Sequence, residues 1–222
     1  MSSDRNADLE CLLDEIREEV SGTSMLTGRP ELGQRVMEAL RQTPRDEFVP
    51  DEFRYRAYDN RPLPIGHGQT ISQPYVVALM TDLIQPRPED VVLEIGTGSG
   101  YQAAVLSRLV KQVYSMEIVG GLATQASERL QRLGYDNVEV RAENGRLGWP
   151  EHAPYDAILV TAAASQVPPA LIDQLKPGGT LVIPVGSRDY AQDLLVITKR
   201  EDGSVQKRDV LPVVFVPLTG AD

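Results

Sequence analysis

From residue 91 onward, the chain alternates short apolar, β-branched runs with segments of helical periodicity. Parallel neighbouring strands cannot be joined by a tight turn, and they need a crossover connection that is usually a helix. This alternation therefore predicts βαβ units in an α/β fold with a doubly wound, mostly parallel sheet. The runs expected to form strands are residues 91–95, 113–117, 138–140, 157–160 and 180–183.

Two more apolar runs, residues 194–198 and 213–216, lie near the end of the sequence. The turn-like residues Glu201-Asp202-Gly203-Ser204 separate them, with no room before the turn for a crossover helix. Strands connected in this way pair antiparallel. The sequence thus predicts a seven-stranded sheet that ends in an antiparallel hairpin.

Residues 1–30 are predicted to form an acidic helical extension. Apolar residues recur there at helical spacing among aspartates and glutamates, which indicates an amphipathic helix with an acidic outer face. The serines and glycine of Ser21-Gly22-Thr23-Ser24 are expected to break this helix. The apolar positions are Leu9, Leu12, Leu13, Ile16 and Val20.

The main domain is expected to span residues 31–222, with a cap at 31–90 and the sheet core at 91–222. In the cap, the spacing of apolar residues from Leu32 to Leu40 predicts a helix, and another is predicted to start after Pro74. Several prolines between them exclude a long helix up to residue 68.

The composition excludes several kinds of partner. The formal net charge is −10 and no large basic cluster interrupts it, so a phosphate backbone is not expected to bind. No stretch reaches the roughly 18 apolar residues of a membrane span. Cys11 is the single cysteine, which excludes an internal disulfide and a cysteine-based metal site. We expect a cytoplasmic monomer without a metal.

A glycine-rich loop follows the first predicted strand of the sheet and precedes a helical pattern. It reads Glu94-Ile95-Gly96-Thr97-Gly98-Ser99-Gly100. Glycines at such a turn let the backbone approach a ligand in the crevice beyond the strand. The Gly-x-Gly-x-Gly spacing, with Glu94 two residues ahead, favours a cationic sulfonium and amino-acid moiety, and a dinucleotide is the alternative. Glu94, Gly96, Thr97, Gly98 and Gly100 are the expected contacts.

Polar residues also follow the next two predicted strands. Glu117 ends the second strand, where a carboxylate can accept hydrogen bonds from both hydroxyls of an adenosine ribose. Asn144 and Gly145 follow the third strand, where the amide could meet an adenine edge and the glycine permits a close turn. An ordinary loop role for Asn144 is equally compatible with the sequence.

Ser72 lies just ahead of the helix predicted after Pro74, where its hydroxyl could cap the helix or act in catalysis. The residues alone do not favour either role. Trp149, His67 and His152 are expected to serve in packing or in loops, because no triad or metal-ligand pattern includes the histidines.

These residues together resemble the protein-L-isoaspartate O-methyltransferase family. The likeness covers about residues 32–219 and is carried by the following segments: residues 64–74 (Pro-Ile-Gly-His-Gly-Gln-Thr-Ile-Ser-Gln-Pro), 94–101, 148–151, 155–158 and 216–219. It implies a Rossmann-like class I methyltransferase fold that uses S-adenosylmethionine, with S-adenosylhomocysteine as the product. It further implies methyl transfer to the α-carboxylate of isoaspartyl residues in damaged proteins and peptides.

By the same resemblance, Ser72 matches the family's active-site serine, and Thr70 shapes the same pocket. Glu94 with Gly96, Gly98 and Gly100 matches the cofactor loop, whereas Glu117 matches the ribose-binding acid.

Two departures leave alternatives open. The family commonly has Gly-Asp-Gly where this chain has Glu143-Asn144-Gly145, and Pro-Glu where it has Gly120-Gly121. One alternative is a related carboxylate methyltransferase that acts on an aspartate of a peptide natural product. Another is an inactive module that only binds the cofactor, although the acceptor loop around Ser72 is retained.

Overall fold

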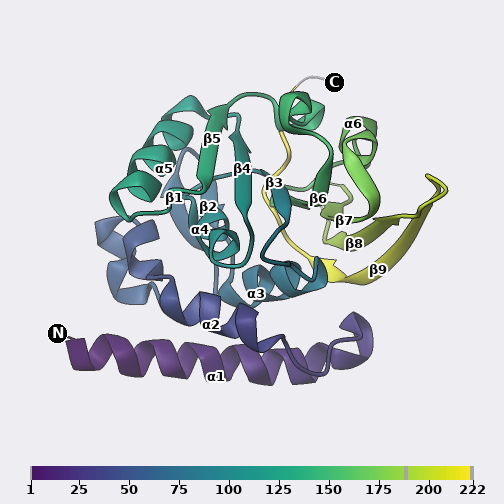
Figure 1. The fold of residues 1–222 in the computed structure, drawn as a ribbon. Coiled ribbons are helices and arrows are strands. Elements are labelled where there is room, and N and C mark those ends of the chain that lie inside the picture. The colour runs from purple at the N-terminus through teal and green to yellow at the C-terminus, as the bar shows by residue number, and fades with distance from the viewer. Residues whose placement is uncertain (1, 188–189, 221–222) are drawn as a thin grey trace.

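The structure is a computed structural model that describes residues 2–187 and 190–220 (Figure 1). A seven-stranded sheet in the order β5-β4-β3-β6-β7-β8-β9 forms its centre. Neighbours from β5 to β7 pair parallel, and β8 and β9 continue the sheet antiparallel, which confirms the predicted fold class. The strands are β3 (Val91–Ile95), β4 (Gln112–Glu117), β5 (Val138–Ala142), β6 (Tyr155–Val160), β7 (Leu175–Val185), β8 (Gln192–Lys199) and β9 (Val205–Val213).

Alternate residues of the central strands enter two separate hydrophobic cores, one on each face of the sheet. Val92 joins the core that contains helices α3 and α4, whereas its neighbour Leu93 joins the core that contains α6. This alternation follows from the two-residue period of a strand. The covering helices are α3 (Pro74–Leu83), α4 (Tyr101–Ser107), α5 (Gly120–Arg132) and α6 (Pro169–Asp173), with the short turns η3 (Gly145–Leu147) and η4 (Pro150–His152).

The position of the last strand differs from the prediction. We expected it at residues 213–216, but β9 spans Val205–Val213. Its first five residues are exposed and mostly polar, because an edge strand is held by backbone pairing with β8 and needs no apolar alternation. The apolar segment after it leaves the sheet and bonds to Ala163 through Val216 O and Leu218 N, at 2.8 and 2.7 Å.

The N-terminal helix α1 (Ser2–Thr27) continues through the predicted break at residues 21–24. Gly22 costs only about 1 kcal/mol in a helix, which tertiary contacts can offset. Thr23 supplies such contacts, since its hydroxyl bonds to the carbonyl of Glu19 at 2.8 Å and to Tyr75 Oη at 2.6 Å. Val20 on the same turn is buried in the core shared with α3.

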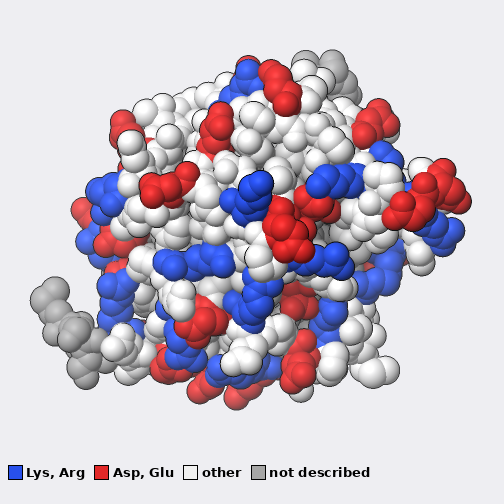
Figure 2. All heavy atoms as spheres, viewed as in Figure 1, with Lys and Arg blue, Asp and Glu red and all other residues white. Residues whose placement is uncertain are grey.

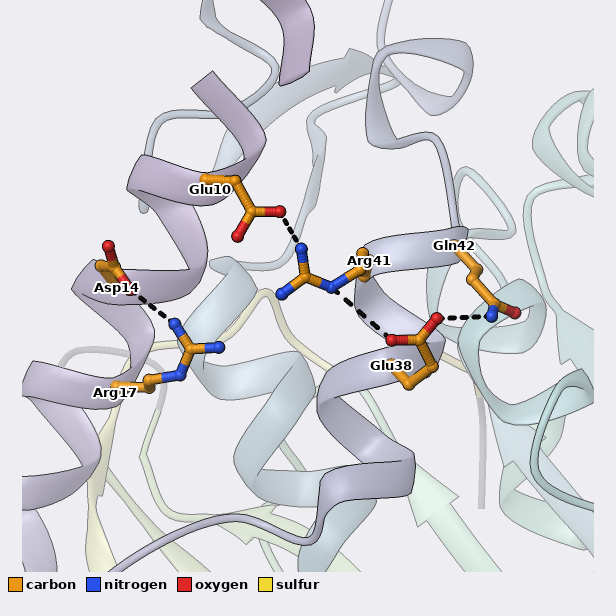
Figure 3. Close-up of polar contacts among 6 residues, drawn as sticks. All are labelled: Glu10, Asp14, Arg17, Glu38, Arg41 and Gln42. Carbon is orange, nitrogen blue, oxygen red and sulfur yellow. Dashed lines mark hydrogen bonds and ion pairs between the residues drawn. The ribbon is translucent and has the colours of Figure 1, made fainter. Parts of the chain in front are cut away.

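Helix α2 (Gln34–Gln42) lies beside α1, which also packs directly against α3 and β9, and a surface ion pair joins the two helices (Figures 1 and 3). Arg41 pairs with Glu10 of α1 and, at 3.6 Å, with Glu38 of its own helix. After α2, the proline-rich stretch forms two short 3-10 helices and a small hairpin rather than a long helix. These are η1 (Arg45–Phe48), η2 (Asp51–Arg56), β1 (Leu63–Gly66) and β2 (Gln69–Ile71).

Replacing Glu10 by alanine should lower the free energy of unfolding by less than about 1 kcal/mol, because exposed ion pairs contribute little. The side chain of Glu10 is half exposed and its partner Arg41 is more than a third exposed. Urea unfolding of the native chain and the variant measures the difference, with Asp14→Ala as a control on the same helix. A loss well above that of the control would show that the Glu10–Arg41 pair anchors α1.

Candidate active site

A pocket lies at the carboxyl ends of β3, β4 and β6, where ligands bind in open parallel sheets. The glycine loop after β3 forms one side, and the acceptor loop (residues 69–73, around Ser72) forms another. The segment 216–219, which had been predicted partly as strand, closes the pocket because it leaves the sheet. The predicted site residues that line the pocket are Thr70, Ser72, Gly96, Thr97, Gly98, Glu117 and Gly145.

The glycine loop requires glycine for steric reasons at its first position. Gly96 has a φ of +101°, and a Cβ there would lie 2.5 Å from Thr161 Oγ1. Thr161 is held in place because its hydroxyl donates to the carbonyl of Gly96 at 2.6 Å. The amide of Gly96 donates to Met116 O at 2.8 Å, which ties the loop to β4. The backbone is thereby fixed close to the pocket.

Glu117 lies at the end of β4 with both carboxylate oxygens engaged by backbone amides. Gly98 N donates to Oε2 at 2.8 Å, and Val119 N donates to Oε1 at 2.9 Å. Each oxygen keeps capacity for a further donor, because an ionised carboxylate has about four acceptor positions. A side chain held in this way fits a pair of neighbouring hydroxyls at the pocket wall.

Three of the predicted contacts do not line the pocket. Gly100 has a φ of +88° and precedes α4, where a Cβ would lie 3.2 Å from Leu130 Cδ1. Asn144 precedes η3, and its Oδ1 accepts a bond from Arg146 N at 3.1 Å. Glu94 is completely buried below the loop. These residues shape the loops rather than face the cavity.

Glu94 is connected to the pocket through two hydroxyl groups. Ser115 Oγ donates to Glu94 Oε2, and Ser115 Oγ lies 2.6 Å from Thr97 Oγ1, which lines the pocket. Oε1 has no hydrogen-bond partner among the described residues. Burial raises the pKa of Glu94 to about 8, and the Ser115 hydrogen bond opposes that shift only in part. Glu94 is therefore largely protonated at neutral pH in the free protein.

The raised pKa of Glu94 predicts a pH dependence of stability. Between pH of about 4.5 and about 8, the unfolded chain releases this proton while the folded chain keeps it. Stability should therefore fall as pH rises through this window, with a contribution from Glu94 of up to about 1.4 kcal/mol per pH unit. The contribution should vanish in Glu94→Gln, so the free energy of unfolding of the variant should increase relative to that of the native chain as pH rises. Urea unfolding of both proteins over this pH range tests the prediction. A difference in unfolding free energy that does not change with pH would contradict it.

The structure favours one of the two roles considered for Ser72. Helix α3 begins at Pro74 and is preceded by Gln73, so Ser72 lies one residue outside the capping position. Its hydroxyl makes no hydrogen bond to any residue that the structure describes. The side chain lines the pocket and is free to donate to a ligand.

Arg45 was not identified from the sequence, yet it supports the acceptor loop. Its guanidinium is completely buried, donates from Nη2 to the carbonyl of Ser72 at 2.8 Å and lies over the ring of Tyr101 at 4.9 Å. Burial lowers the pKa of Arg45 to about 10, so it remains a cation at neutral pH. From the sequence, an arginine in a proline-rich stretch is expected to be a solvent-exposed charge. No pattern in a single sequence shows that Arg45 is buried instead.

The aromatic and histidine residues that the sequence patterns left without a catalytic role lie in packing or turn positions. Trp149 is buried in the core on the α6 face, and His152 stacks on Tyr114 with 3.8 Å between ring centroids. His67 lies in the turn between β1 and β2 with a φ of +52°. The described residues contain no cluster of three or more metal-ligating side chains and no helix long and apolar enough to cross a membrane. On the face shown in Figure 2, basic and acidic side chains are interspersed.

The cavity has two features that fit S-adenosylmethionine. The Glu117 carboxylate, held by two backbone amides and able to accept further hydrogen bonds, lines it, and the loop at Gly96 has no space for a side chain. Together with the seven-stranded sheet, this defines a class I S-adenosylmethionine-dependent methyltransferase.

Comparisons with known proteins narrow the class to a family. The family model of protein-L-isoaspartate(D-aspartate) O-methyltransferase matches residues 27–222, and the chain belongs to this family. A protein-L-isoaspartate O-methyltransferase 2 from a Polaromonas species is 59% identical over 94% of this chain and 99% of its own length. A relative of the same name from Syntrophobacter fumaroxidans is 57% identical, over 94% of this chain and 85% of the relative.

Solved structures agree with the family. A protein-L-isoaspartate O-methyltransferase structure matches with a TM-score of 0.83 and 28% identity, covering 96% of this chain and 66% of that one. A protein from Plasmodium falciparum, solved with S-adenosyl-L-homocysteine, matches with a TM-score of 0.74 and 26% identity. That match covers 92% of this chain and 97% of the other.

Proposed function

We propose that this chain transfers a methyl group from S-adenosylmethionine to the α-carboxylate of isoaspartyl residues in damaged proteins and peptides. The observation that carries the proposal is the position of Ser72, whose free hydroxyl lines both the cofactor pocket and a second cavity. Thr70, Thr161 and Val216 are also shared between the two cavities. A donor in the first cavity and an acceptor in the second would therefore meet at Ser72.

The cofactor contacts are proposed as follows. Glu117 binds the ribose hydroxyls, and the loop with Gly96, Thr97 and Gly98 surrounds the amino-acid moiety. Gly145 lines the pocket on the side proposed for adenine, and Asn144 shapes its turn. Glu94 and Gly100 support the glycine loop from behind.

S-adenosylmethionine supplies an electrophilic methyl group on a sulfonium. The acceptor carboxylate forms the new C–O bond as the S–CH₃ bond breaks, and the bonding electron pair stays on sulfur, which yields S-adenosylhomocysteine. No general base is needed, because a free α-carboxylate has a pKa of about 3.5 and is already ionised. Placing carboxylate and methyl in line in a site that excludes water can supply up to ~7–11 kcal/mol in well-oriented systems, and Ser72 Oγ contributes one part of it by donating a hydrogen bond that orients the carboxylate.

The methyl ester is the first step of repair in this proposal. The following backbone nitrogen displaces methanol to form a succinimide, and hydrolysis of the ring returns part of the material to normal aspartate. These later steps need no residue of the protein. We propose that the chain acts as a monomer in the cytoplasm, in keeping with its acidic charge and the absence of a membrane-spanning helix from its described part.

The proposal is tested by following the product on one isoaspartyl peptide. With the chain and labelled S-adenosylmethionine, mass spectrometry should find one added methyl group on the α-carboxyl of the isoaspartyl residue. On further incubation, succinimide and then normal aspartate should accumulate. A stable methyl ester on a normal aspartate side chain would instead indicate the related enzyme of peptide natural products. Cofactor binding without transfer to either peptide would indicate an inactive module.

A further inference from the structure

The second cavity, which we call the acceptor cavity, is partly built by the N-terminal helix. It has a volume of about 370 Å³ and is lined by the acceptor loop, by residues 211–216 at the end of β9 and just beyond it, and by Glu19 of α1. Glu19 precedes the residues 27–222 that the family model matches. A residue of the N-terminal helix, ahead of the part that the family model matches, therefore contributes to the wall where the acceptor is proposed to bind.

Helix α1 is firmly attached to the segment that follows Ser72. Gln73 Nε2 donates to both carboxylate oxygens of Glu19, at 3.0 and 3.3 Å, and Asn60 Nδ2 donates to Oε2 at 2.8 Å. One turn further along α1, Thr23 Oγ1 lies 2.6 Å from Tyr75 Oη. The position of Glu19 is thus fixed relative to the acceptor loop.

The charge of Glu19 has no cationic partner among the described residues. Its hydrogen-bond partners, Gln73 and Asn60, are both neutral amides, and no lysine or arginine of the described chain pairs with it. Among the described residues that line the acceptor cavity, Glu19 is the one ionisable acid or base apart from the phenol of Tyr75. A half-buried carboxylate with neutral partners attracts a cation and repels an anion over several ångströms.

We propose that Glu19 is a specificity-determining residue that favours isoaspartyl acceptors carrying a lysine or arginine next to the damaged residue, and disfavours those carrying an acid there. The inference rests on the proposed function and adds a preference among its substrates. The cation of the flanking side chain pairs with Glu19 while the α-carboxylate remains at Ser72. Gln73 follows Ser72 in the chain and is hydrogen-bonded to Glu19, so Ser72 and Glu19 keep a fixed relative position in the cavity wall. The two ends of the acceptor therefore contact the same fixed surface.

The test compares three isoaspartyl peptides that differ only in having lysine, glutamine or glutamate at the flanking positions. For the native chain, kcat/KM should be about three- to fivefold higher for the lysine peptide than for the glutamine peptide, as expected for a partly exposed charge pair. The glutamate peptide should fall below the glutamine peptide by a similar factor. Added salt should reduce both differences.

The variant Glu19→Gln removes the charge and should bring the three peptides to the same kcat/KM, whatever its effect on turnover of all three. Glu18→Gln is the matched control, because it removes the same charge from an exposed neighbour outside the cavity. An unchanged lysine-to-glutamate ratio in Glu19→Gln overturns the proposal. So does a loss by the same factor on all three peptides, which would assign Glu19 a purely structural role. If the native chain methylates none of the peptides, the proposed function itself fails.

Discussion

Replacing Glu117 by alanine should weaken the binding of S-adenosylmethionine about a hundredfold. Two hydrogen bonds from ribose hydroxyls to an ionised carboxylate contribute about 1.5–3 kcal/mol each, and losing about 3 kcal/mol corresponds to this factor. The amides of Gly98 and Val119 would also lose their acceptors, which loosens the loop that surrounds the cofactor. Isothermal titration calorimetry with the native chain and the variant measures the dissociation constant.

Glu128→Ala is the control for Glu117→Ala, since Glu128 is an exposed acid on α5 and does not line the pocket. The dissociation constant of S-adenosylmethionine from Glu128→Ala should equal that from the native chain. If Glu117→Ala also binds S-adenosylmethionine with nearly native affinity, the assignment of Glu117 to the ribose is wrong.

Replacing Ser72 by alanine should lower kcat on an isoaspartyl peptide about a hundredfold, the loss typical of removing one donor that stabilises charge in a transition state. Affinity for S-adenosylmethionine should stay close to native, because in our proposal the cofactor is held mainly by the glycine loop and Glu117. The fold should also be retained, since the hydroxyl makes no bond within the described chain and does not cap α3. Single-turnover kinetics and calorimetry on the same preparation separate the two effects.

Ser72→Thr tests whether the hydroxyl itself is responsible. Threonine keeps the donor, so this variant should recover part of the activity lost in Ser72→Ala. Full turnover in the alanine variant would exclude Ser72 from the reaction. A parallel loss of cofactor affinity would show that Ser72 acts on the loop rather than on the acceptor.

The parallel sheet could be predicted because its central strands β3 and β6 are buried on both faces and its strands are separated by helical segments, a pattern that is visible in a single sequence. The edge strand β9 could not, since residues such as Lys207 and Arg208 are exposed and carry no alternation. Local sequence patterns also failed to predict that α1 continues past Gly22. That continuation depends on the contact between Thr23 and Tyr75, which are far apart in the sequence.

The candidate site was predicted best where a residue's place on a strand determines its position. Glu117 and the glycines at 96 and 98 follow strands whose carboxyl ends meet, so they line one pocket. Glu94 belongs to the same motif but lies inside the strand, where its side chain turns into the core. Pattern alone does not distinguish a carboxylate that faces a ligand from one that supports the loop below it.

Residues whose contacts join segments far apart in the chain could not be identified from the sequence. Arg45 reaches the carbonyl of Ser72 only because η1 packs under the acceptor loop, and Glu19 reaches Gln73 only because α1 crosses α3. Both are charged residues that read as solvent-exposed in the sequence. Their placement comes from tertiary contacts that no local spacing encodes.

The most direct test of the central claim is methyl transfer to two peptides of the same sequence, one with an isoaspartyl residue and the other with normal aspartate. With labelled S-adenosylmethionine, the chain should methylate the isoaspartyl peptide and leave the aspartyl peptide unlabelled. Ser72→Ala should lower labelling of the isoaspartyl peptide in the same assay. Equal labelling of both peptides, or labelling of the aspartyl peptide alone, would contradict the proposed function.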